Sequence, residues 1–101
     1  MALDETFRQA VYETVETSLD EVLGVKTARA LRFYVDVKSA LRNPGRFFAL
    51  MLELVGPRQA ERLRKQVLSN LYTRYQLEYK PTGKSISEEL TELKSQVKTL
   101  A

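Results

Sequence analysis

Apolar residues recur along this chain at the spacing of an α-helix. Over residues 4–23 they repeat every three or four positions, at Phe7, Val11, Val15, Leu19 and Val22. A second stripe runs through residues 57–76, at Ala60, Leu63, Val67, Leu71 and Tyr75. Stripes of this kind are typical of amphipathic helices that bury one side against a core. Both segments are therefore predicted to be α-helices.

The segment 26–41 carries two patterns. Ala28, Leu31, Val35 and Leu41 approximate a helical stripe, whereas residues 33–37 alternate in the manner of a strand. Five residues without a partner strand elsewhere in the chain do not make a sheet. We therefore predict a helix, with an end near Lys38 as the alternative boundary.

The stretch from Pro44 to Val55 is the most apolar of the chain, and Arg46 and Glu53 are its only charged residues. Its apolar positions cover more than one helical face, which predicts a central helix enclosed by neighbours. Asn43 and Pro44 are typical of a helix start, and Gly56 of a helix end.

A last helix is predicted after the loop at residues 80–84. Ser85 and Glu88 match a capping box, and apolar residues then follow at heptad spacing, at Ile86, Leu90, Leu93, Val97 and Leu100. A helix of two heptads is marginal alone, so this seam must pack on something. It either docks on its own domain or pairs with a second chain, and its narrow shape favours self-association, giving a homodimer.

These segments predict an all-α fold, a compact bundle of about five helices in one domain. Residues 1–80 form the helical core. Residues 81–101 add a loop and the heptad-like helix, as part of the same domain or as a dimerisation arm. The length of 101 residues suits one domain.

Composition removes several kinds of chemistry. The chain has no Cys and no His, which excludes disulfides, thiolate metal sites, cysteine nucleophiles and histidine bases. Gly83-Lys84-Ser85 lacks the glycine that a phosphate loop needs at position 78, which is Glu78. The carboxylates between Glu13 and Glu21 lie on one helix, and such groups do not converge on a cation. We therefore expect no enzyme activity, no metal and no cofactor.

Charge is divided unevenly. Residues 1–23 carry six carboxylates and one arginine, whereas residues 24–48 carry six basic residues and one carboxylate. Basic residues at helical spacing suit contacts with phosphates, so nucleic-acid binding, including DNA, is the alternative function. The residues predicted for it are Arg29, Arg32, Arg58, Arg62 and Lys65.

No apolar run approaches the roughly 20 residues that cross a bilayer, and no secretory signal is visible at the first residues. The expectation is a cytoplasmic protein without a membrane partner.

A further indication comes from the order of landmarks. Asn43-Pro44, Phe47, Leu50, the Leu54-Val55-Gly56 run, Leu63, Val67, Leu71-Tyr72 and Leu77-Glu78-Tyr79 follow one another, with Ala28, Leu31 and Tyr34 upstream. Over about residues 8–80 the chain resembles the Nitrosopumilus output domain family, a small archaeal family of unknown function. The family has a longer segment between its second and third helices. The resemblance implies a helical archaeal domain and brings no catalytic residues.

Together these observations predict a non-enzymatic helical interaction or output module that self-associates, with a protein partner.

Overall fold

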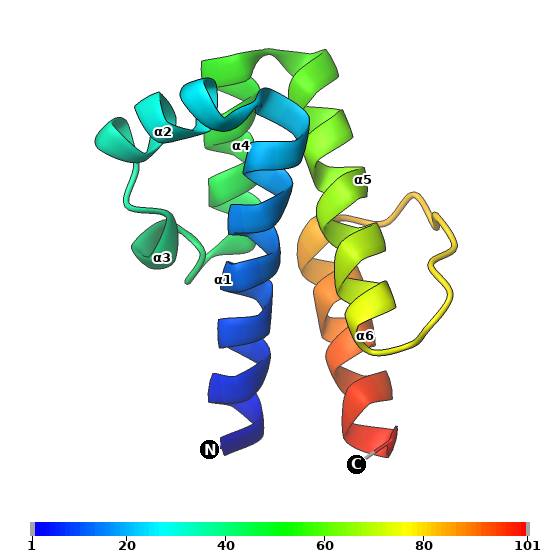
Figure 1. Cartoon of the computed structure of the whole chain (residues 1–101). Coiled ribbons are helices and arrows are strands. Elements are labelled where there is room, and N and C mark those ends of the chain that lie inside the picture. Colours follow the sequence, from blue (N-terminus) through cyan, green and yellow to red (C-terminus); the bar gives the residue numbers. More distant parts are fainter. Residues whose placement is uncertain (1, 101) are drawn as a thin grey trace.

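Six α-helices make up the regular structure of this chain (Figure 1). The computed structural model describes the backbone of residues 2–100 and the side chains of residues 5–98. In chain order the helices are α1 (Ala2–Leu23), α2 (Val25–Tyr34), α3 (Val37–Ala40), α4 (Pro44–Val55), α5 (Pro57–Arg74) and α6 (Ile86–Leu100). Strands are absent from residues 2–100, so the all-helical prediction is confirmed. Within the same range no helix combines the length and the apolar composition that a membrane span requires.

The two long helices α1 and α5 run antiparallel side by side and share the most extensive contact between elements (Figure 1). The predicted stripes form this contact, since Val15 and Leu19 of α1 and Leu63 and Val67 of α5 are fully buried. A polar bond joins the helices as well, because the side-chain amide of Asn70 donates to the Ser18 hydroxyl at 3.0 Å. The centre of the core therefore lies between α1 and α5.

The segment predicted as one helix over residues 26–41 is two helices. Val35 has extended backbone angles (φ −129°, ψ 123°), and the Asp36 side chain accepts a hydrogen bond from the Ser39 amide, which starts α3. Val35 and Val37 are buried while Asp36 between them is exposed. The strand-like alternation thus marked a real extended break, and it raises the helix count from the predicted five to six.

α4 has the predicted bounds, yet it is less enclosed than the sequence indicated. Phe47, Phe48 and Met51 are buried, whereas Leu52 and Leu54 are 49% and 48% exposed. The helix packs chiefly on α5, and it also contacts α3 and α6. An apolar helix buries only the faces that neighbours reach, so the prediction of a central α4 is correct only in outline.

A strap over residues 75–85 leads from α5 to α6. Of the predicted capping box, the Ser85 cap is present, since its hydroxyl oxygen accepts from the Glu88 amide at 3.2 Å. The Glu88 carboxylate accepts from the Ser85 hydroxyl at 3.1 Å, rather than from the Ser85 amide as a full capping box requires. The strap lets α6 lie beside the α1–α5 pair and cover the lower part of the core (Figure 1).

Candidate functional site

The apolar seam of α6 lies inside the core of its own chain. Ile86, Leu90, Leu93 and Val97 are at most 8% exposed and belong to the same apolar cluster as residues of α1, α4 and α5. Leu100, the fifth residue of the predicted seam, lies outside the residues whose side chains are described. α6 therefore docks within one chain, the first of the two arrangements that the sequence left open.

A buried carboxylate holds α6 on the side of the strap. Glu89 is 2% exposed, and its oxygens contact the Thr82 hydroxyl at 2.8 Å and the Arg64 guanidinium at 3.4 Å. Arg64 also pairs with Glu61 at 2.8 Å. Burial of Tyr79 raises the pKa of its hydroxyl, and the nearby negative charge of Glu89 raises it further. The predicted seam of this helix does not include Glu89, and sequence reasoning missed its role because its partners come from other elements.

The five residues that were predicted to contact nucleic acid differ in their surroundings. Arg32 donates to Glu16 at 2.6 Å and to Asp20 at 3.2 Å, so it ties α2 to α1. Arg29, Arg58, Arg62 and Lys65 are exposed. Among the residues with described side chains, Arg29 and Arg58 have no ion-pair partner. The predicted set thus divides into one structural arginine and four surface cations.

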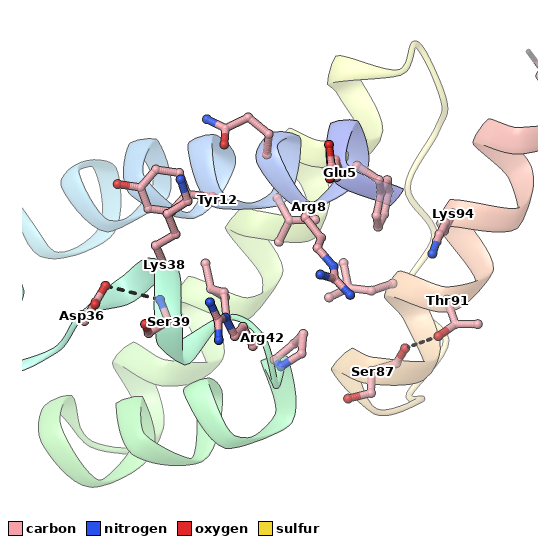
Figure 2. Close-up of a pocket in the computed structure, with 16 residues that line it drawn as sticks. Glu5, Arg8, Tyr12, Asp36, Lys38, Ser39, Arg42, Ser87, Thr91 and Lys94 are labelled. Carbon is pink, nitrogen blue, oxygen red and sulfur yellow. Dashed lines mark hydrogen bonds between the residues drawn. The ribbon is translucent and has the colours of Figure 1, made fainter. Parts of the chain in front are cut away.

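The described residues form a cleft of about 690 Å³ that no sequence pattern predicted. Its walls come from α1, from the α3 segment with the turn before α4, and from α6. Figure 2 shows this space with its lining side chains. Segments from the two ends and the middle of the chain meet there.

Positive charge gathers around the cleft. Arg8 comes from α1, Lys38 from α3, Arg42 from the following turn, and Lys94 from α6. In Figure 2, Arg8 and Lys94 extend from opposite walls into the space between α1 and α6, with Arg42 on the third side. Lys38 lies 5.8 Å from the ring centre of Tyr12, a distance typical of a cation–π contact.

Two carboxylates line the same cleft, Glu5 and Asp36. Asp36 is already engaged, because its oxygen caps α3 through the Ser39 amide at 3.3 Å. Even without Lys94, the three cations Arg8, Lys38 and Arg42 face the two carboxylates Glu5 and Asp36, so the lining carries more positive than negative groups.

Two helix N-termini lie beside the cleft. Pro44 at the start of α4 and Ser87 in the first turn of α6 both line the cleft. The two helix starts also touch, since the Ser87 hydroxyl lies 3.4 Å from where a β-carbon at Gly45 would stand. A helix N-terminus carries a partial positive charge, but in the first turn of α6 Glu88 and Glu89 already offset it.

Four other basic residues form ion pairs outside the cleft. Arg32, Arg64, Arg74 and Lys84 each have a carboxylate partner away from the cleft. Arg8 and Arg42 have none among the residues whose side chains are described. Like charges held near one another repel, and a bound anion would reduce the repulsion between Arg8 and Arg42.

Sequence reasoning missed the cleft because its cations are distant in the chain. In the sequence, Arg8 is the single basic residue of the acidic segment 1–23. Arg42 is the residue before the predicted helix start at Asn43-Pro44. Neither signal indicates a site until the fold brings the segments together.

Among residues with described side chains, no cluster of three or more carboxylates could hold a metal ion. The resemblance to the Nitrosopumilus output domain family stays a prediction. No family model, curated protein or solved structure matches this chain.

Proposed function

We propose that this chain is a non-enzymatic binding module that recognises a small anion in the cleft between α1, the α3 segment and α6. The main support is the convergence of Arg8, Lys38, Arg42 and Lys94 from three separate parts of the fold on one cavity. Arginine forks match carboxylate and phosphate oxygens.

Thermal unfolding at low ionic strength tests this function with inorganic phosphate and sulfate as probes. A ligand that binds only the folded chain raises the melting temperature as its concentration rises. We expect this rise in the natural chain and its loss in the double variant Arg8→Gln/Arg42→Gln. The charge-matched control Arg29→Gln/Arg58→Gln should keep it. An equal response of both variants, or no response of the natural chain to any anion, would contradict the function.

Nucleic-acid binding is the second candidate. The supporting observation is the exposure of Arg29, Arg58, Arg62 and Lys65, of which the first two lack a described ion-pair partner. Arg32 contributes less, because Glu16 and Asp20 already hold it. A labelled DNA duplex should then bind with an affinity that falls steeply with salt. Arg58→Gln/Arg62→Gln should weaken it, and Arg8→Gln/Arg42→Gln should not.

Self-association remains a proposal in a changed form. Since the seam of α6 is buried within the chain, a homodimer through this seam would need α6 to leave its own core and dock in the partner's. Exchange of one element between chains is a known route to dimers. Light scattering on the purified chain, over a range of concentrations, would reveal such a dimer.

A further inference from the structure

We infer that the ligand of the cleft is an organic anion, one acidic head on an apolar body, rather than an inorganic oxyanion. The inference rests on the proposed function and adds the ligand class to it. A phosphate monoester and a carboxylate share the required chemistry, which is a planar or tetrahedral group of oxygens at the end of a short apolar chain.

Size is the first argument. Pockets for organic ligands in proteins measure roughly 300–1,000 Å³, and the cleft, at about 690 Å³, lies in the middle of that range. A sulfate or phosphate ion would fill only a small part of this space and leave the rest to water. A ligand that fills the cleft therefore needs a body as well as a head.

The second argument is the apolar part of the lining. Phe7 and Val11 from α1, Leu90 from α6, and Leu41 and Pro44 from the turn between them all face the cleft. Phe7, Val11 and Leu90 are 5–6% exposed, so they form a floor that belongs to the core. Leu41 is partly exposed and lies nearer the rim. Apolar surface of this kind gains free energy when an apolar ligand body covers it.

The arrangement of charge sets the head group. Arg8, Arg42 and Lys94 approach from three sides, as Figure 2 shows, whereas Glu5 and Asp36 also line the cleft. The carboxylates offset part of the positive charge, which leaves room for one or two negative charges on the ligand. They also oppose a polyanion such as a nucleic-acid strand, whose repeated phosphates would approach them. One acidic head placed among the three cations fits this balance.

Isothermal titration calorimetry with the full chain tests the inference through a series of probes: inorganic phosphate, then ethyl, butyl and hexyl phosphate. Each added methylene group should raise the affinity about two- to fourfold until the cleft is filled, because each covers more apolar surface. Hexanoate distinguishes a carboxylate head from a phosphate head. Hexanol lacks the charge and should bind at least about a hundredfold more weakly than hexyl phosphate.

Leu41→Ala supplies the matching variant, since Leu41 lines the cleft near its rim. It should weaken hexyl phosphate by about tenfold and leave inorganic phosphate unchanged. Leu50→Ala is the control, because Leu50 is also partly exposed but lies on α4 away from the cleft. Unfolding curves of both variants show that they are folded at the temperature of titration.

Equal affinities for inorganic and hexyl phosphate would overturn the inference and leave the proposed function standing. Failure of every anion to bind would overturn both. An equal loss of hexyl phosphate affinity in Leu41→Ala and Leu50→Ala would also overturn it, since the effect would not come from the cleft.

Discussion

Glu89 is the residue on which the docking of α6 depends most. A carboxylate that is 2% exposed has lost nearly all contact with water, and only its partners can offset that cost. Thr82 from the strap and Arg64 from α5 supply them, so one side chain joins three parts of the chain. Its position at the start of α6 also suits a negative charge, because the helix N-terminus is positive.

Replacing Glu89 by Ala should lower the free energy of unfolding by about 2–3 kcal/mol, since it leaves Arg64 and Thr82 short of a partner and opens a small void. Arg64 keeps Glu61, which limits the loss. Glu92→Ala is the control on the same helix, because Glu92 pairs with Lys84 at the surface and should cost less than about 0.5 kcal/mol. Urea unfolding measures both, and equal losses would contradict the role given to Glu89.

Acid should weaken the fold through its surface carboxylates. The hydrogen bond from Arg64 lowers the pKa of Glu61, and those from Gln9 and Arg74 lower the pKa of Glu13. A carboxylate with a lowered folded-state pKa stabilises the fold above its ordinary value of 4.5, and this contribution disappears as the pH falls through the lowered pKa.

Glu61→Gln should therefore make the urea midpoint less sensitive to pH between pH 7 and strong acid. The difference should stay below about 1 kcal/mol, because both members of the pair reach water. Glu53→Gln on α4 is the control, since Glu53 forms no ion pair with a described residue. A variant that loses as much stability on acidification as the natural chain would contradict the sign of the effect.

At the scale of the elements, the ends of the helices decide the geometry of the cleft. Asp36 starts α3 and Asn43 starts α4 through side-chain hydrogen bonds to the amides of Ser39 and Arg46, both at 3.3 Å. These caps hold the turn that carries Arg42 at a fixed place beside α1. α3 and the turn after it, which lie between these two caps, thus form one wall of the cleft.

Asp36→Ala and Asn43→Ala should each lower the free energy of unfolding by about 1 kcal/mol, the usual effect of losing an N-cap. Asn43→Ala should also weaken phosphate binding, because the turn then holds Arg42 less firmly. Asp36→Ala removes a carboxylate from the cleft as well, and the loss of that negative charge opposes the weakening. Thr27→Ala, at an exposed position inside α2, should change either quantity little. Chemical unfolding and calorimetry separate the two effects, and unchanged stability in both cap variants would show that these bonds matter little.

Much of the element order could be predicted from local signals. The bounds of α4 followed from Asn43, Pro44 and Gly56, and the start of α6 from Ser85 and Glu88, because caps are local chemistry. The break at Val35 and Asp36 could not be separated from a helix, since the alternation there spans too few residues to outweigh the helical stripe around it.

The cleft could not be predicted from the sequence either, and for a different reason. Arg8, Arg42 and Lys94 each lie in a different segment, and nothing in any one segment signals the other two. For the seam of α6, one segment does indicate burial but does not indicate the surface that covers it. Its spacing predicted that these residues would be buried, yet the same spacing serves docking on one's own core or on a second chain.

In the whole molecule, the unevenly distributed charges of the sequence form ion pairs between segments. The acidic α1 pairs with α2 through Glu16 and Arg32 and with α5 through Glu13 and Arg74. These pairs use carboxylates on the sides of α1 that face α2 and α5. The remaining basic residues are then divided between the cleft and the outer surface, which keeps the two candidate functions on separate sets of side chains.

Removing residues 85–101 should destroy cooperative folding rather than release a stable monomer. The deletion takes Ile86, Leu90, Leu93 and Val97 out of the core and exposes the apolar faces they cover. Calorimetry and light scattering should show a broad or absent transition together with aggregation. A truncated chain that melts sharply and is monomeric would mean that α6 is an independent arm.

The hydroxyl of Tyr79 gives the strap an unusual property. This oxygen is buried and has no hydrogen-bond partner among the described residues. Its ring, by contrast, packs on Tyr72 with 5.1 Å between centres. Tyr79→Phe would keep that packing and delete a buried hydroxyl whose approach to Glu89 falls short of ordinary hydrogen-bond geometry, so the free energy of unfolding should rise slightly. A search for a more stable variant of this chain could therefore begin with the removal of the Tyr79 hydroxyl.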